Sequence, residues 1–173
     1  TDRPSAKGKF LFLGDEKFYI RGVTYGPFRP EADDNKYHNP DVVDRDFAQI
    51  AANGFNAVRA YTVPPRWLLD IAWQYGLRVM VGLAVERQAT FFDDRRQVRA
   101  IEERVRAEVR ACASHPAILC YTVGNEIPAS IVRWQGRRRV QHCLKRFYEV
   151  AKAEDPGALV TYVNYPSTEY LEL

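Results

Sequence analysis

The stretch Ala117–Pro128, which reads AILCYTVGNEIP, constrains the fold of this chain more than any other. Its first seven residues are mostly β-branched, aromatic or aliphatic and show no clean polar alternation. This pattern is typical of a strand buried on both faces, as in a parallel sheet covered by helices. Gly124 permits a tight turn, and Asn125 and Glu126 then follow at the carboxyl end of the strand. Ligands and catalytic groups gather at that end of parallel sheets, which makes Glu126 a candidate functional carboxylate.

Similar strands recur along the chain, separated by segments with helical periodicity. Two short apolar segments around Gly14-Asp15-Glu16 predict a β-hairpin before the alternation begins, and residues 1–9 ahead of it are expected to be a linker. Alternation of apolar strands with amphipathic helices predicts a parallel sheet covered by helices. The expected strands are 22–25, 55–61, 77–83, 117–123 and 158–163, and the expected helices are 41–53, 64–75, 93–114 and 129–153.

Composition supports one globular domain. The chain has 173 residues, of which 46% are hydrophobic and 27% charged, so it is neither disordered nor fibrous. Its formal net charge is only +3. The one dense basic cluster, Arg137-Arg138-Arg139, lies in an expected helix, and we interpret it as a solvated helix face in preference to a nucleic-acid contact.

Motifs for metals, nucleotides and membranes are missing from the sequence. The three cysteines lack CxxC spacing and the three histidines lack any ligand spacing, so no metal site is expected. No GxGxxG or GxxxxGK spacing occurs, and we expect no nucleotide cofactor. No apolar run reaches the roughly 18 residues of a membrane span, and the first residues lack the pattern of a signal peptide, which leaves the compartment open.

Four segments in the same order resemble the first half of a glycoside hydrolase barrel. They are FYIRGVTY at 18–25, GFNAVRAY at 54–61, YGLRV at 75–79, and the strand from His115 to Glu126 that ends in Gly-Asn-Glu. Together they resemble clan A glycoside hydrolases, nearest to glycoside hydrolase family 2. The resemblance implies an α/β fold of the (β/α)₈ TIM-barrel type. Here it would be an incomplete barrel of about five parallel strands after an N-terminal hairpin, with residues 10–173 as the N-terminal portion of the domain.

The resemblance also implies roles for particular side chains. Glu126 would be the general acid and base, Asn125 would bind the 2-hydroxyl of the sugar, and Arg59 would support the nucleophile electrostatically. Glu86 follows the third strand and is either a substrate-binding acid or a member of a loop salt bridge. A tyrosine at a strand end is as often rim packing as a sugar contact. The remaining candidate substrate-binding residues are Tyr25, Tyr61, Asn164 and Tyr165.

The activity implied is retaining hydrolysis or transfer on a β-linked glycan by double displacement, without a cofactor. The nucleophile of the family is a glutamate on the seventh strand, expected beyond the end of this chain, so the chain alone is expected to be inactive. The expected partners are a carbohydrate substrate and, through exposed edge strands, the rest of the barrel or a second copy. A non-catalytic carbohydrate-binding or scaffold domain of the same fold is the alternative. The sugar and the linkage stay open.

Overall fold

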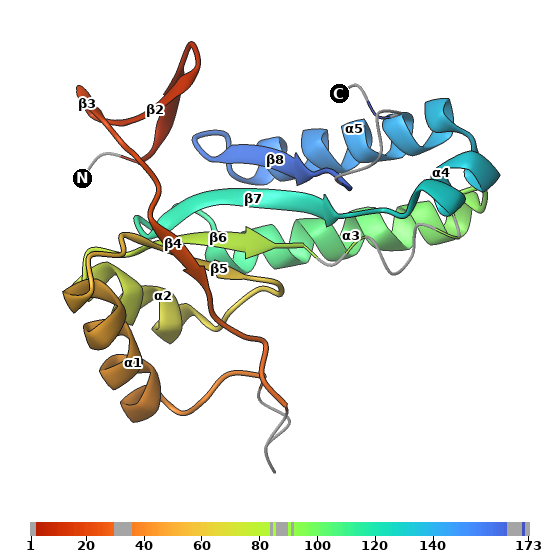
Figure 1. Ribbon diagram of the computed structural model, residues 1–173. Coiled ribbons are helices and arrows are strands. Elements are labelled where there is room, and N and C mark those ends of the chain that lie inside the picture. The colour runs from red at the N-terminus through yellow and green to blue at the C-terminus, as the bar shows by residue number, and fades with distance from the viewer. Residues whose placement is uncertain are drawn as a thin grey trace.

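A parallel sheet forms the centre of the molecule, and a small antiparallel sheet lies at one end of it (Figure 1). The computed structural model describes residues 3–29, 36–83, 85, 90, 92–165 and 171. Within these residues the small sheet consists of β1 (Ser5–Lys7), β2 (Phe10–Leu13) and β3 (Glu16–Lys17). The parallel sheet has the order β4-β5-β6-β7-β8. Its strands are β4 (Gly22–Thr24), β5 (Ala57–Ala60), β6 (Arg78–Gly82), β7 (Ile118–Asn125) and β8 (Leu159–Val163).

Helices alternate with these strands and begin where the sequence offers a cap. The Asn39 side chain accepts a hydrogen bond from the Val42 amide at 3.1 Å at the start of α1. Asp94 accepts one from the Arg96 amide at 2.7 Å at the start of α3. Such caps satisfy amides that have no partner inside the helix. The helices are α1 (Pro40–Ala52), α2 (Arg66–Gln74), α3 (Arg95–Cys112), α4 (Ala129–Gln135) and α5 (Arg137–Glu154). The expected incomplete α/β barrel of about five parallel strands behind an N-terminal antiparallel element is therefore confirmed.

Two segments differ from the expectation. Residues 5–7, within the segment expected to be a linker, form β1 and pair with β2, Ser5 opposite Phe12. The single helix expected over 129–153 is wrong, because the segment divides into α4 and α5 at Gly136. Gly136 has φ = 87°, a backbone conformation that residues other than glycine rarely adopt. This conformation ends the first helix.

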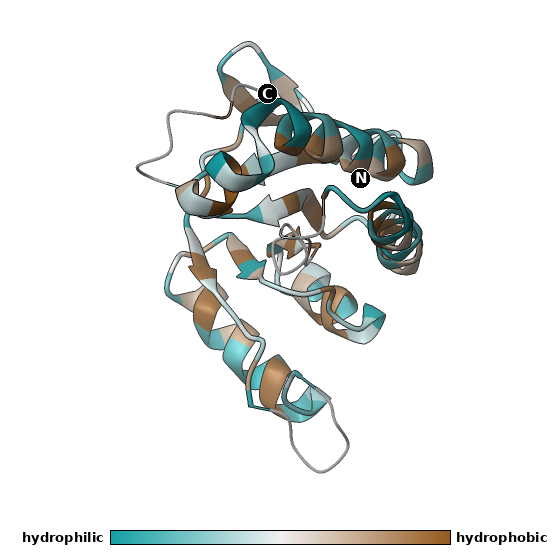
Figure 2. Ribbon diagram, turned by 90° about the vertical axis from the view of Figure 1, so that its right-hand side faces the viewer, coloured by the Kyte–Doolittle hydropathy of each residue, from teal (hydrophilic) through white to brown (hydrophobic). Residues whose placement is uncertain are grey.

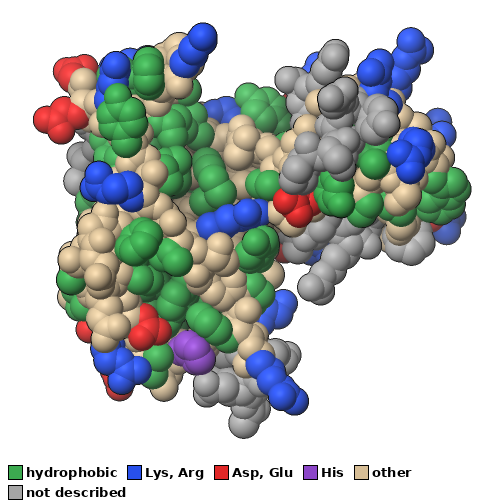
Figure 3. Space-filling model, in the orientation of Figure 1, with side chains coloured by type: hydrophobic (Ala, Val, Ile, Leu, Met, Phe, Trp, Pro, Cys, Tyr) green, Lys and Arg blue, Asp and Glu red, His purple; other side chains and the backbone are tan. Residues whose placement is uncertain are grey.

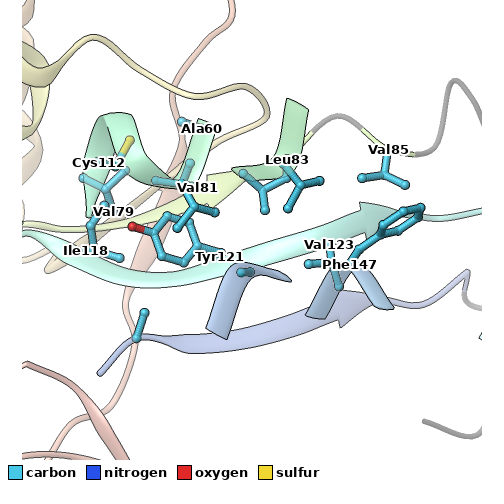
Figure 4. Packing of buried hydrophobic residues seen from close by; sticks show 14 of the residues in the cluster. Ala60, Val79, Val81, Leu83, Val85, Cys112, Ile118, Tyr121, Val123 and Phe147 are labelled. Carbon is cyan, nitrogen blue, oxygen red and sulfur yellow. The ribbon is translucent and has the colours of Figure 1, made fainter. Parts of the chain in front are cut away.

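The main core lies between the sheet and its helices (Figures 2 and 4). Val79 and Val81 of β6 and Tyr121 and Val123 of β7 belong to this core; Val79 lies near Cys112 of α3, and Val123 lies near Phe147 of α5 (Figure 4). Viewed from the end at which the strands finish, the helices show brown segments toward the sheet and teal segments outward (Figure 2). Burial of these apolar side chains is the main force that holds the helices on the sheet.

The opposite face of the sheet has a smaller core at one end. Ala57, Leu119 and Cys120 are buried there, and Leu11 and Phe18 from the antiparallel segment pack against them. The antiparallel sheet therefore covers this face near the amino ends of the strands (Figure 1). The antiparallel sheet does not cover the carboxyl ends of the strands, where polar side chains such as Asn125 lie.

A buried ion pair attaches the N-terminal segment to the loop between α5 and β8. Arg3 donates two hydrogen bonds to Asp155, at 2.6 and 2.9 Å, and the Asp155 side chain is only 2% exposed. The Tyr121 hydroxyl and the Ser114 amide donate to the same carboxylate at 3.1 and 3.2 Å. Burial pushes the pKa of Asp155 upward, but the hydrogen bonds and charge of Arg3, with the other two donors, outweigh it and hold the pKa below its ordinary value.

We expect Asp155→Asn to lower the free energy of unfolding by about 2–3 kcal/mol at neutral pH, because Arg3 then loses its charged partner in a largely buried site. Since the folded pKa of Asp155 is depressed, its contribution is complete above the ordinary pKa near 4 and is lost as pH falls through the folded value. The difference between wild type and variant should therefore shrink in acid, as measured by urea unfolding at several pH values. Asp15→Asn, at an exposed ion pair, is the control and should change stability by less than about 0.5 kcal/mol. A pH-independent difference would contradict this account.

The two outer strands of the parallel sheet, β4 and β8, each pair on one side only among the described residues. Unpaired strand edges are templates for association. We expect the isolated chain to self-associate, measured by sedimentation velocity over a range of concentrations. A monomer at all concentrations with slowly exchanging amides in β4 and β8 would be the contrary result.

Candidate functional site

Arg59 and Asn125 meet at the carboxyl end of the parallel sheet, although they come from strands that are not neighbours. Arg59 lies on β5 between Val58 and Ala60, which are buried under the helices, so its side chain takes the opposite face. There its guanidinium donates a hydrogen bond to the Oδ1 atom of Asn125, at the end of β7. The contact spans the width of β6, which lies between the two strands. The sequence analysis named both as candidate site residues, and the structure brings them into contact.

Glu126 follows β7 directly and turns away from the strand. Its backbone has φ = 49°, a left-handed conformation that is uncommon for residues other than glycine. Its amide donates a hydrogen bond to the Val163 carbonyl oxygen of β8 at 2.8 Å, which holds this turn against the sheet. The side chain is exposed, and its carboxylate makes no hydrogen bond or ion pair with the described residues. A carboxyl group in this position can accept a proton from a bound molecule or donate one to it.

Tyr162 of β8 supports the turn that carries Glu126, a role that the sequence did not reveal. Gly124 has φ = 128°, and a Cβ atom there would lie 3.3 Å from the Tyr162 ring. The Tyr162 hydroxyl accepts a hydrogen bond from the Ile127 amide at 3.1 Å. The tyrosine therefore contacts both sides of Glu126. The available sequence signal was weak: an aromatic residue one position before the end of an outer strand.

An aromatic ring lies beside the Arg59–Asn125 pair. The Arg59 guanidinium stands 4.4 Å from the centre of the Tyr61 ring, a cation–π contact, and Tyr61 is 39% exposed. Figure 3 views the face of the sheet opposite the helices, where positively and negatively charged side chains lie among hydrophobic ones. An exposed ring next to hydrogen-bonding groups can stack on the apolar face of a sugar.

Tyr25 lies elsewhere, on the side of the sheet that carries the helices. It is 8% exposed, and its ring contacts Phe47 of α1 edge to face at 4.9 Å. Its hydroxyl donates to Asp46 at 2.8 Å. Burial, and then the hydrogen bond and charge of Asp46, raise the pKa of Tyr25 well above its ordinary value. These contacts are those of a packing residue.

Asn164 and Tyr165 follow β8, whose last residue, Val163, is the partner of Asn125 in the sheet. Asn164 lines a groove of about 810 Å³ between α5 and β8, together with Tyr148 and Tyr162. Tyr165, the next residue, is 38% exposed. Glu86 lies outside the described residues.

The cysteines and the possible metal ligands in the described part of the chain do not form a second reactive site. Cys112, Cys120 and Cys143 are free and buried. Burial raises the pKa of both the Cys112 and the Cys120 thiol to about 12, so neither is a ready nucleophile. No group of three or more His, Cys, Asp or Glu side chains among the described residues is arranged to hold a metal ion. None of the helices described is both long and apolar enough to cross a membrane.

This chain is similar in sequence to a known protein family and to several curated proteins. The family profile described as "Glycosyl hydrolases family 2, TIM barrel domain" matches residues 5–173. "Beta-galactosidase 2" of Enterobacter cloacae is 30% identical over 123 residues, which are 67% of this chain and 12% of that protein. "1,3-beta-glucanosyltransferase gel1" of Aspergillus fumigatus is 39% identical over 59 residues, 34% of this chain and 13% of that protein. The chain thus spans 12–14% of the length of the curated relatives it matches.

Solved structures share the fold at low sequence identity. Saccharomyces cerevisiae Gas2p in complex with laminaripentaose superposes with a TM-score of 0.73 and 21% identity, over 94% of this chain and 40% of that one. Bifidobacterium dentium beta-glucuronidase complexed with coumarin-3-O-glucuronide gives a TM-score of 0.71 and 14% identity, over 92% and 26% of the respective chains. This chain therefore shares its fold with a part of each of these structures.

We expect Tyr162→Phe to speed amide hydrogen exchange at Ile127 and to lower the free energy of unfolding by about 1 kcal/mol, because the amide loses its acceptor. Exchange monitored by NMR provides the measurement. Tyr148→Phe, at an exposed tyrosine of α5, is the matched control and should leave Ile127 unchanged. Equal exchange at Ile127 in wild type and Tyr162→Phe would show that the hydroxyl does not hold this turn.

Proposed function

Because this chain belongs to the glycosyl hydrolases family 2 TIM barrel domain family, we propose that it forms the N-terminal part of a clan A glycosidase or transglycosidase that acts on a β-linked glycan. The observation that carries the proposal is the pair Asn125-Glu126 at the carboxyl end of β7, with Arg59 bound to the asparagine. In TIM-barrel enzymes the active site lies at this end of the strands.

Glu126 is the proposed general acid and base. In the first step its carboxylic acid would protonate the glycosidic oxygen while a carboxylate nucleophile attacks the anomeric carbon, so that the bond between that carbon and the glycosidic oxygen breaks and the leaving group departs as an alcohol. In the second step the Glu126 carboxylate would take a proton from water or from the hydroxyl of another sugar. The oxygen that loses this proton would attack the anomeric carbon and displace the nucleophilic carboxylate, which breaks the covalent bond between sugar and enzyme. The exposed side chain, free of partners among the described residues, supports this role. The nucleophile is proposed to come from a later strand outside this chain, about 5–5.5 Å from Glu126 as in retaining enzymes.

Arg59 sets the direction of the Asn125 amide. A guanidinium only donates hydrogen bonds, so the side-chain oxygen of Asn125 must face Arg59. The amide nitrogen then points the other way, where its two hydrogens can donate to a sugar hydroxyl. This geometry supports the proposed contact of Asn125 with the 2-hydroxyl. The positive charge of Arg59 at the same edge would stabilise an anionic nucleophile.

The other candidate sugar-binding residues are supported by the structure to different degrees. Tyr61 has an exposed ring beside Arg59 and is the proposed stacking surface for a sugar. Tyr165 and Asn164 follow β8 and stay predictions, as does Glu86. Tyr25 has the surroundings of a packing residue, and the proposal makes no use of its side chain.

The relatives support carbohydrate chemistry of both kinds, since one is named a glucanosyltransferase and another a galactosidase. Water and a second sugar are therefore both proposed acceptors. The outer strands β4 and β8 are proposed to pair with the rest of a barrel in a longer polypeptide or with a second copy of this chain.

Kinetics of the longer polypeptide that contains this chain test the role of Glu126. We expect Glu126→Gln to lower kcat on aryl β-glycosides by about 10²–10⁴-fold, the range of general acid–base catalysis. The loss should be largest for poor leaving groups such as phenol and smaller for dinitrophenol, because a good leaving group needs less protonation. Azide should restore turnover of the dinitrophenyl substrate, because it attacks the glycosyl enzyme without a base.

Glu149→Gln is the matched control, since Glu149 is an exposed glutamate on α5. Its kcat should equal that of the wild type. Unchanged turnover in Glu126→Gln would exclude the proposed role. Carbohydrate binding without turnover in the unaltered protein would instead favour a non-catalytic binding domain.

A further inference from the structure

The segment that follows Glu126 is strongly basic. Residues 127–148 contain Arg133, Arg137, Arg138, Arg139, Lys145 and Arg146 and no aspartate or glutamate, in a chain whose formal net charge is only +3. Arg146 forms an ion pair with Glu102, and Arg139 donates to Gln135. Arg133, Arg137 and Arg138 are exposed and have no side-chain partner among the described residues. The charge is therefore concentrated on α4 and the start of α5.

The start of α3 extends this charged surface. The Arg146–Glu102 ion pair at 2.6 Å and the ring contact of Phe92 with Phe147 at 5.8 Å show that α3 and α5 lie side by side. Glu102 is seven residues from the start of α3 and Arg146 nine from the start of α5, so the two helices begin at levels that differ by about 3 Å. In Figure 3, Lys and Arg side chains gather at the end of the molecule where Figure 1 places α4 and these two helix starts.

The arginines at these helix starts are not explained by helix stability. Arg95 and Arg96 open α3, Arg137 and Arg138 open α5, and neither helix has an acidic residue in its first turn. The positive end of the helix dipole disfavours cations there. Among the described residues, Asp93 and Asp94 precede α3 and Glu126 precedes α4, and the Asp94 carboxylate accepts hydrogen bonds from two amides of α3. A net positive surface remains.

An exposed tryptophan lies within the basic surface. Trp134 is 67% exposed, the highest value among the exposed large hydrophobic residues of the described chain. Arg133 precedes it on α4, and the Gln135 side chain that follows donates to the Thr90 carbonyl oxygen at 2.6 Å. That hydrogen bond fixes α4 beside the segment that leads into α3. The ring lies on α4 and faces solvent, where a ligand can reach it.

This surface adjoins the proposed catalytic carboxylate. Helix α4 begins at Ala129, three residues after Glu126, and Trp134 lies only about 8 Å farther along the helix axis. A glycan chain that leaves Glu126 on this side would pass over α4. We propose that the basic rim, defined as Arg95, Arg96, Arg133, Trp134, Arg137 and Arg138, binds the continuing part of a glycan substrate that carries acidic groups such as carboxylates.

The chemistry matches both parts of such a ligand. Guanidinium groups pair with carboxylates through directional, charge-assisted hydrogen bonds, and the indole ring stacks on the apolar face of a sugar. The proposal rests on the glycosidase function proposed above, which supplies the reason for a sugar chain to lie at this edge. It favours a glycan over an anionic lipid surface because the rim continues the edge that carries Glu126, Asn125 and Arg59.

Affinity electrophoresis of this chain provides the test. Gels would contain carboxymethyl cellulose, a β-linked polymer that carries carboxylates, or hydroxyethyl cellulose as the matched uncharged β-linked polymer. We expect retardation by carboxymethyl cellulose only, with a dissociation constant that rises with salt. Trp134→Ala and the double variant Arg137→Gln/Arg138→Gln should each weaken binding by about tenfold, the effect of losing two exposed charge contacts or one stacking contact.

Two controls separate this proposal from its alternatives. Lys9→Gln/Arg45→Gln removes the same charge from exposed positions elsewhere and should leave binding unchanged. Glu126→Gln should also retain binding, so loss of catalysis and loss of the rim are measured separately. Equal binding to hydroxyethyl cellulose, or equal weakening by the control pair, would overturn the proposal. So would binding to phosphatidylglycerol vesicles, in flotation, by a chain that is not retarded by carboxymethyl cellulose.

Discussion

Burial of β7 on both faces is the constraint on which the rest of the structure depends. Seven successive residues, Ile118–Gly124, are buried. Tyr121 and Val123 face the helices, whereas Leu119 and Cys120 face the core closed by the antiparallel segment. A strand covered on both sides cannot slide or turn over without exposing apolar surface to water. The first residues beyond that cover, Asn125 and Glu126, are therefore held at a fixed place at the carboxyl end of the sheet.

The candidate site is stabilised by contacts between its own side chains as well as by burial of β7. Arg59 reaches across the width of β6 to Asn125 and receives the ring of Tyr61 against its guanidinium. Tyr162 contacts Gly124 and accepts the Ile127 amide, so Glu126 sits between two points fixed by β8. The left-handed backbone at Glu126 persists because these contacts surround it. Rigid neighbours and an exposed carboxylate are the combination that proton transfer to a bound sugar requires.

Sequence reasoning recovered elements whose pattern is local. The strands and helices followed from apolar periodicity, and Asn125 was placed at the carboxyl end of the sheet because it follows a buried strand, whereas the role of Arg59 was implied by the family resemblance. It failed at Gly136, where one residue with positive φ divides an otherwise continuous amphipathic segment into α4 and α5. The arginines of 137–139, interpreted as a solvated helix face, are exposed in the structure. That they lie near the start of α3 and the exposed Trp134 cannot be seen in a linear pattern.

The sequence by itself determined the α/β alternation, the parallel sheet and the identity of the carboxylate at the end of β7, because burial and turn preferences act between residues close in the chain. Only the tertiary structure decided which strand-end side chains meet. Tyr25 and Tyr61 both follow β-strands, yet Tyr25 packs under α1 while Tyr61 lies on Arg59. Tyr25 is held by Phe47 of α1, and Arg59, which Tyr61 contacts, is held by Asn125, 66 residues farther along the chain. These directions therefore depend on contacts between distant segments, which a local sequence pattern does not contain.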